Sequence, residues 1–213
     1  MENIKKRIMI ASKKEKADLV FKNANVLNVF SEEFIKADVA IVDGFIAGVG
    51  CYDGVEEIDC TDQFLCPGFM DAHVHIESSM VMPSELAKTI LKSGTTTIIA
   101  DPHEIVNVVG TKAMKFFLDS TENIPLNIFF MLPSSVPATE FETNGASFTA
   151  DELSLFLNYP RILGLGEVMC YPNVLSGDDQ ILSKIHLCQN KMIDGHAPAL
   201  TGSDLQAYAC VGI

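Results

Sequence analysis

The feature that most constrains the fold is a change of pattern at Pro67-Gly68. After this turn, short β-rich segments alternate with segments of helical periodicity, which is typical of βα units that build a parallel sheet. We predict strands near 69–75, 95–100, 127–132, 162–168 and 192–196, with helices in the gaps. Five such units in series make this an α/β protein.

Two parallel architectures compete for this pattern. A doubly wound sheet would have a glycine-rich phosphate loop after its first strand, and that position here holds His73 and His75. Polar residues at several strand ends favour a (β/α)₈ TIM-type barrel. A whole barrel takes about 250 residues, so residues 67–213 predict an incomplete barrel of about five βα units that lacks three more.

Residues 1–66 predict a separate small β domain, part of a composite β-sandwich. Alternating segments flank Asp43-Gly44, which is a strong signal for a two-residue hairpin, so we expect a small antiparallel sheet. The first sixteen residues hold six of the fifteen basic side chains and predict a surface helix rather than a targeting peptide.

Helix limits are indicated by four signals. Gly94 predicts the end of the first barrel helix, and Thr149-x-x-Glu152 is a capping box that predicts the start of the third. The fifth helix is expected to open near Ser203-x-x-Gln206 and to stop at Gly212.

Composition limits the kinds of partner that the protein can bind and the cellular compartment in which we expect it. The net charge of −13 argues against nucleic-acid binding, because an acidic surface repels phosphate backbones. No apolar run approaches the roughly 18 residues of a membrane helix, so we expect no membrane partner. The six cysteines are scattered without a C-x-x-C pair or a secretory signal, which predicts buried, reduced thiols and a cytoplasmic protein.

His73 and His75 form the strongest chemical signal. They lie two residues apart on an expected strand, so both imidazoles point to the same side. At the carboxyl end of a barrel strand this pair would be a bidentate seat for a divalent metal. An H-x-H motif alone is weak, and its place after the Pro-Gly turn at the start of the βα series strengthens it.

Two further strand ends carry metal-ligand residue types. Glu167 follows two glycines at the end of the fourth strand and could bridge two ions, although an isolated glutamate is more often a surface residue. His196 ends the fifth strand, and a core histidine is the alternative reading. Histidine, glutamate and histidine on one rim favour a metal centre.

Four segments carry a family resemblance. They are Cys66-Pro-Gly-Phe-Met-Asp-Ala-His-Val-His-Ile-Glu-Ser-Ser79, Ala100-Asp-Pro-His-Glu-Ile105, Gly164-Leu-Gly-Glu-Val-Met169 and Asp194-Gly-His-Ala-Pro198. Together they resemble the N-terminal portion of the adenine deaminase family of the amidohydrolase superfamily, from about Ala17 to the end of the chain. H-x-H is shared across the superfamily, whereas H-x-H-I-E-S-S and D-P-H-E are much narrower signals.

The resemblance implies a binuclear divalent metal centre and a purine substrate. His73 and His75 would hold one metal, Glu167 would bridge, and His196 would hold the other; the metal is expected to be Mn or Fe, with Zn as the alternative. The implied reaction is hydrolytic deamination of adenine to hypoxanthine and ammonia. No lysine lies near Glu167, so a carboxylated-lysine bridge is disfavoured.

The resemblance also suggests catalytic or substrate-binding roles for residues beside the implied metal centre, and some of these residues have an alternative role. Asp101 and Glu167 are the candidate catalytic groups; Asp101 could orient a histidine ligand or simply form an Asp-Pro turn. His103 and Glu77 are the candidate substrate-binding residues. Glu77 could equally pair with a neighbouring helix.

Two ligands of the family, a histidine after the sixth strand and an aspartate after the eighth, have no counterpart here. We therefore expect a truncated form that does not deaminate adenine appreciably by itself, and a homo-oligomer for the full-length enzyme. The alternatives are another cyclic amidohydrolase, dihydroorotase-like or imidazolonepropionase-like, and an inactive metal-binding fragment. The cytidine-type zinc deaminases are excluded because P-C-x-x-C is missing.

Overall fold

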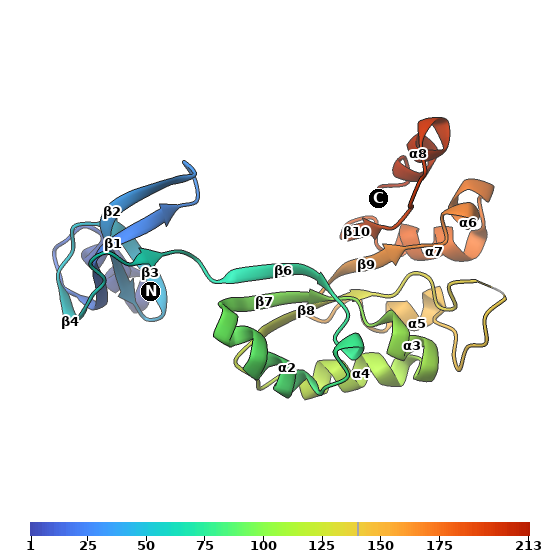
Figure 1. The fold of residues 1–213 in the computed structure, drawn as a ribbon, viewed down its shortest axis with the longest axis horizontal. Helices are drawn as coiled ribbons and strands as arrows, with labels where there is room; N and C mark the ends of the chain where they lie inside the picture. The colour runs from blue at the N-terminus through green and yellow to red at the C-terminus, as the bar shows by residue number, and fades with distance from the viewer. Residues whose placement is uncertain (140) are drawn as a thin grey trace. The chain divides into compact units, whose positions relative to one another are not determined.

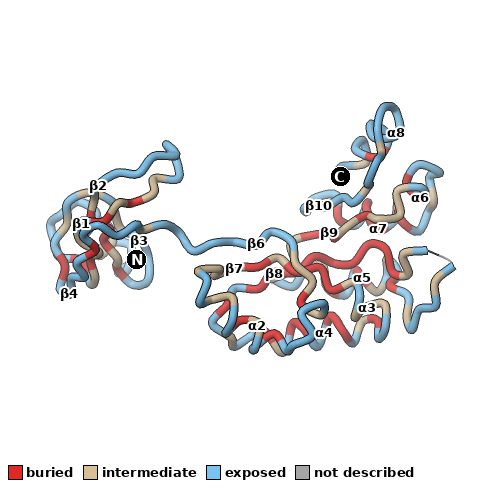
Figure 2. Tube along the Cα trace, viewed as in Figure 1, coloured by how far each residue is buried: buried red, intermediate tan, exposed pale blue. Residues whose placement is uncertain are grey.

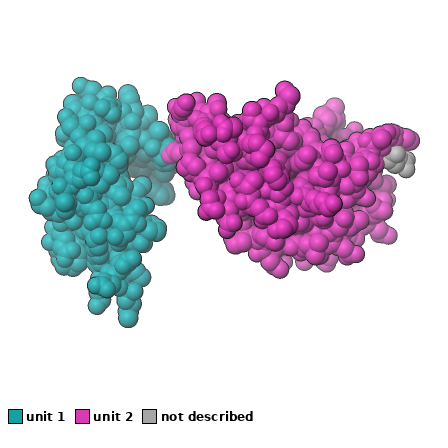
Figure 3. Space-filling model, turned by 90° about the horizontal axis from the view of Figure 1, so that it is seen from below, with its two compact units in different colours: residues 1–67 teal, residues 68–213 magenta. Residues whose placement is uncertain are grey.

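The computed structural model describes residues 1–139 and 141–213. The chain forms two compact units, Met1–Pro67 and Gly68–Ile213, which Figure 3 colours separately. Each unit has hydrophobic clusters of its own: Val20 and Val39 lie in two clusters of unit 1, and Phe130 lies in the large core of unit 2.

Unit 1 is a five-stranded sheet preceded by a helix. Its elements are α1 (Glu2–Ala11), β1 (Ala17–Asn28), β2 (Glu33–Val42), β3 (Phe45–Gly50), β4 (Gly54–Asp59) and β5 (Phe64–Leu65). The strand order is β3-β2-β1-β4, with β5 also paired to β1. The expected antiparallel sheet is wrong in one respect: β4 and β5 run parallel to β1, so the sheet is mixed. These strands return to β1 through connections that no hairpin signal marks.

The predicted hairpin is confirmed. Asp43 and Gly44 both have positive φ, 50° and 76°, and Val42 pairs with Phe45 across the turn. Positive φ at both central residues matches the right-handed twist of the strands, which is why Asp-Gly is favoured here. The predicted N-terminal helix is also present as α1, and its Ile10 is fully buried.

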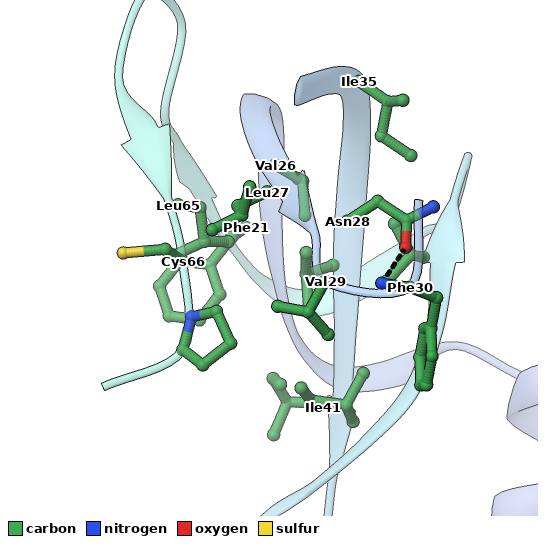
Figure 4. A pocket seen from close by; sticks show the side chains of 14 residues that line it. Phe21, Val26, Leu27, Asn28, Val29, Phe30, Ile35, Ile41, Leu65 and Cys66 are labelled. Carbon is green, nitrogen blue, oxygen red and sulfur yellow. Dashed lines mark hydrogen bonds between the residues drawn. The ribbon is translucent and has the colours of Figure 1, made fainter. Parts of the chain in front are cut away.

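One face of the unit 1 sheet is hollowed into an apolar groove with a volume of about 550 Å³. Figure 4 shows its lining, which includes Phe21, Val29, Phe30 and Ile41 and has Cys66 as its single titratable side chain. The Phe30 amide donates to the Asn28 side chain at 3.1 Å and closes the turn at the groove's edge. Apart from Cys66 and Asn28, the side chains that line the groove are apolar.

Unit 2 is a curled, all-parallel sheet flanked by helices (Figure 1). Its strands are β6 (Phe69–Val74), β7 (Thr95–Ala100), β8 (Asn127–Leu132), β9 (Ile162–Val168) and β10 (Met192–Gly195), in spatial order β10-β9-β8-β7-β6. Its helices are α2 (Pro83–Ile90), α3 (His103–Val109), α4 (Thr111–Ser120), α5 (Ala150–Ser154), α6 (Tyr171–Ser176), α7 (Asp179–Leu187) and α8 (Gly202–Ala209), with short 3₁₀ turns η1 (Glu77–Ser79) and η2 (Leu91–Ser93). The predicted α/β class with five βα units in a half-barrel is confirmed.

The core of unit 2 lies along the central strands. Figure 2 shows β7, β8 and β9 mostly buried or half-buried, while β6 is exposed over nearly its whole length. Phe130 and Leu165 are fully buried, together with Met114 from α4. This burial fixes the strands whose carboxyl ends carry the candidate site residues.

The helix limits are partly as expected. Gly94 ends η2 in the left-handed region, and the Thr149–Glu152 capping box is present at the start of α5. The last helix, α8, begins at Gly202, close to the expected Ser203, but it has no side-chain cap, and it ends at Ala209, before the expected stop at Gly212. Ser203 therefore lies inside the helix. Gly202 has a φ of 62° and turns the chain into the helix one residue earlier.

The cysteine expectation is only partly correct. All six thiols are free, but only Cys60 and Cys188 are buried, while Cys51, Cys66 and Cys210 are exposed. The exposed three lie just after strands or a helix, where the chain is at the surface. Within residues 1–139 and 141–213, no helix has the length and apolar character needed to cross a bilayer.

Candidate metal centre

His73 and His75 lie together at the carboxyl end of β6. Their Nε2 atoms are 3.2 Å apart, close enough for both to contact one ion. The Nδ1 atom of His75 is 2.8 Å from the backbone carbonyl of Asp101, an arrangement that fixes the ring and leaves Nε2 free to act as a ligand. Asp101 thus contacts His75 through its backbone carbonyl and not through its carboxylate.

Glu167, at the end of β9, stands at the centre of the cluster. Its Oε1 lies 3.3 Å from His73 Nε2 and 3.3 Å from His196 Nδ1. Its Oε2 lies 3.6 Å from His75 Nε2 and 3.4 Å from His103 Nδ1. The Glu167 side chain is only 12% exposed, so a single carboxylate meets four imidazoles in a partly dry site.

Asp101 and His103 lie beyond β7, Asp101 one residue after the strand and His103 at the start of α3. The Asp101 carboxylate is 1% exposed, and neither oxygen has a hydrogen-bond partner among the residues that the structure describes. His103 Nδ1 is 3.5 Å from Asp101 Oδ1. The nearby Asp101 carboxylate raises the pKa of His103 above its ordinary value, against the opposing effect of burial.

Glu77 caps the neighbouring helix. Its Oε1 accepts hydrogen bonds from the backbone amides of Glu104 and Ile105, at 3.1 and 3.3 Å, in the first turn of α3. Ser78 Oγ adds a bond to the Glu104 carboxylate at 2.8 Å. Burial raises the pKa of Glu77. Of the two roles expected for Glu77, the structure contains the contact with the helix.

His196 follows β10, and its ring is 53% exposed. Its backbone amide donates to the hydroxyl of Tyr208 at 3.0 Å, and that hydroxyl donates to the Val168 carbonyl at 2.6 Å. Tyr208 therefore ties His196 to the end of β9. Sequence reasoning did not single out Tyr208, because a lone tyrosine in a helix carries no signal of a contact with two strands.

The two glycines before Glu167 have different physical reasons. A Cβ at Gly164 would lie 1.8 Å from the Met192 carbonyl, so Gly164 permits the close approach of β10. A Cβ at Gly166 would lie 2.2 Å from Asp101 Oδ2. Gly166 thus leaves the space that the Asp101 carboxylate occupies beside β9, and glycine within a strand often marks such a close approach.

The donor set fits divalent metal. Ligand atoms of His73, His75 and Glu167 lie within 4.8 Å of one another, and so do those of Asp101, His103 and Glu167. Both groups offer imidazole nitrogens and carboxylate oxygens, which suit Mn, Fe and Zn. Throughout the described part of the chain, no lysine or arginine pairs with Glu167 or Asp101. The unpartnered buried carboxylate of Asp101 is what a site built around cations requires.

The half-barrel resembles known hydrolase structures. Zinc-complexed atrazine chlorohydrolase from Arthrobacter aurescens TC1 aligns with 81% of this chain and 51% of its own, at a TM-score of 0.56 and 14% identity. The β-aspartyl dipeptidase of Fervidobacterium islandicum AW-1 aligns with 92% of this chain and 54% of its own, at a TM-score of 0.52 and 20% identity. At these identities the similarity concerns the fold.

Sequence relatives are much closer. Adenine deaminase 2 of Carboxydothermus hydrogenoformans is 50% identical over all 213 residues, and an adenine deaminase of Clostridium acetobutylicum is 51% identical over 93% of the chain. The chain spans 37% and 35% of the length of these two relatives. The model of the amidohydrolase family matches residues 64–209, which hold every candidate site residue. The chain therefore belongs to the amidohydrolase family.

Proposed function

We propose that the protein containing this chain hydrolyses adenine to hypoxanthine and ammonia with divalent metal. The observation that carries the hydrolytic chemistry is the Glu167 carboxylate, which lies within 3.3–3.6 Å of four imidazoles on one rim. The relatives at about 50% identity are adenine deaminases, and they support adenine as the substrate.

The geometry supports a proposed set of metal ligands. His73 and His75 would hold one ion, His196 would hold the second, and Glu167, which lies beside all three imidazoles, would bridge the two. Mn or Fe is the proposed metal, with Zn as the alternative. When bound, such ions polarise the substrate and lower the pKa of a water molecule from about 15.7 towards 7.

Other residues of the chain handle protons and the base. Asp101 is buried, and its carboxylate has no hydrogen-bond partner among the described residues, so it is available to accept and return a proton, as general acid–base catalysis requires. His103, which lies beside Glu167 on the same rim, donates a hydrogen bond to a ring nitrogen of the purine. Glu77 contributes to substrate binding through its Oε2, which is buried and has no hydrogen-bond partner among the described residues.

The organisation and setting of the protein remain proposals of the same kind. Residues 1–66 form the small β domain and residues 67–213 the first part of the hydrolase barrel. The partner is a small purine, and neither nucleic acid nor membrane takes part. We propose a cytoplasmic homo-oligomer for the full-length enzyme.

The test is ammonia release from adenine after loading with Mn²⁺ or Fe²⁺. The chain is assayed alone and in a chimaera in which it replaces the matching segment of the Carboxydothermus relative. We expect the chimaera to be active on adenine and the chain alone to be nearly inactive. Dihydroorotate and imidazolonepropionate serve as control substrates. Preference for either control would assign the chain to another cyclic amidohydrolase, and a chimaera inactive on all three would support a degenerate fragment.

A further inference from the structure

On the side of β8, the end of β9 is held by a side chain rather than by strand pairing. The pairing of β8 with β9 ends at Leu132 and Leu165, two residues before Glu167. Beyond that point the Ser134 hydroxyl donates to the Glu167 carbonyl at 2.6 Å. The same carbonyl accepts a bond from the Met169 amide at 2.7 Å. Two donors therefore fix the backbone from which the central carboxylate projects.

Ser134 is itself fixed from the opposite side. Its carbonyl accepts a 2.6 Å hydrogen bond from Nζ of Lys184, which lies on α7. The Ser134 and Ser135 hydroxyls are 3.0 Å apart, and the Ser135 hydroxyl accepts from the Cys170 amide at 3.3 Å. Ser134 is 1% exposed and Lys184 is 7% exposed. These contacts run without a break from a buried ammonium group to Glu167.

Burying the ammonium group of Lys184 to anchor α7 costs free energy. No ion pair of Lys184 occurs within residues 1–139 and 141–213, and burial lowers its pKa to about 8. An apolar side chain of similar length would pack α7 without the cost of removing a cation from water. The feature that an apolar side chain would lack is the donor to the Ser134 carbonyl.

We propose that Ser134 and Lys184 are positioning residues for the Glu167 carboxylate. The inference rests on the proposed function, because it gives Glu167 the central role in the metal centre. Lys184 fixes the position of the Ser134 carbonyl after β8. The Ser134 hydroxyl in turn fixes the Glu167 carbonyl near the end of β9. The Glu167 carboxylate is then already placed beside His73, His75 and His196 when metal binds. Partners of this kind, one step behind the ligands, set the geometry and affinity of metal sites.

The test uses Co²⁺ binding to the intact chain, followed by calorimetry and by the visible absorption of the bound ion. Ser134→Ala and Lys184→Met are each expected to weaken binding about tenfold and to change the absorption spectrum. Ser134→Thr, which keeps the hydroxyl, is expected to restore both. A spectral change with rescue reports ligand geometry, which a general loss of stability would not alter.

The chain offers matched controls. Ser183 also donates to a backbone carbonyl at 2.6 Å, but on the exposed face of α7. Lys191 donates to the Ile162 carbonyl at 2.9 Å, at the opposite end of β9. Ser183→Ala and Lys191→Met should bind Co²⁺ as the parent does. If Lys184→Met does not fold, Ser134→Ala and Ser134→Thr decide the question.

Two results would overturn the proposal, and they are distinguishable. A parent chain that binds Co²⁺ together with a Ser134→Ala variant of unchanged affinity and spectrum would remove the positioning role and leave the metal centre intact. A parent chain that binds no Co²⁺ would overturn the metal centre and the positioning role together.

Discussion

At the scale of the residue, the candidate site depends on Glu167 more than on any single histidine. Each of its oxygens faces two imidazoles, whereas His73, His75 and His196 each contact no carboxylate but Glu167 among the described residues. The sequence predicted Glu167 and the histidines because each follows a recognisable strand. It could not predict Ser134 and Lys184, which are 50 residues apart and meet only through the packing of α7 on the sheet.

Glu167→Gln is expected to weaken binding of Mn²⁺ or Co²⁺ by the chain more than tenfold, because it removes the shared charge while keeping the side-chain shape. Loss of a residue that only supports a ligand already costs about 10–100-fold. Isothermal titration calorimetry measures the effect. Glu122→Gln, at an exposed position after α4, is the control, and equal affinities for the two variants would contradict a central role for Glu167.

The buried ammonium of Lys184 predicts a pH dependence of stability. The pKa of Lys184 is about 8 in the folded chain, whereas its ordinary value is 10.5. Between about pH 8 and pH 10.5 the unfolded chain therefore binds one more proton than the folded chain. Stability therefore rises with pH through this window, and the full cost of burial is present below about pH 8. The raised pKa of Cys188, about 11, acts in the opposite direction but is shared by parent and variant.

Lys184→Met removes this titration. The variant's free energy of unfolding, relative to the parent, is expected to fall by about 1.4 kcal/mol for each pH unit between about 8 and 10. Urea unfolding of both proteins at several pH values gives the difference, with Lys191→Met as the control for loss of a lysine. A difference that stays constant across this range would show that Lys184 is not buried as a cation.

At the scale of the element, β9 is the strand on which the site is assembled. Its end is held by Ser134 on the β8 side and by Tyr208 on the β10 side. The strands of unit 2 were predictable almost to the residue, because each is a short apolar run bounded by turns. The parallel pairing of β4 and β5 with β1 was not, because pairing between distant segments leaves no local pattern.

Tyr208→Phe tests the hold on the β10 side. The substitution leaves the His196 amide and the Val168 carbonyl without their common partner, which is expected to cost about 1–3 kcal/mol of unfolding free energy. Urea unfolding measures this cost. Tyr159→Phe, at a position that is 45% exposed, is the control and should be nearly neutral. The same small effect in both variants would mean that Tyr208 contributes packing alone.

At the scale of the whole molecule, the two units predict different responses to metal. Every candidate ligand lies in Gly68–Ile213, so metal binding should stabilise that unit. At a free metal concentration of about 100 times Kd, the gain is about 2.7 kcal/mol. Amide hydrogen exchange should slow in β8 and β9 and stay unchanged in β1 and β2, and EDTA should reverse it. Uniform slowing in both units would contradict a site confined to unit 2.

The cap that Glu77 places on α3 has a consequence for how this rim could evolve or be engineered. One carboxylate from the loop after β6 fixes the first turn of the helix after β7, and the Ser78–Glu104 bond doubles the link. These hydrogen bonds therefore hold the segment that carries His75 and the helix that carries His103 in a fixed position relative to one another. Exchanging either loop for that of a relative would displace the other, so the two loops can be transplanted only as a pair.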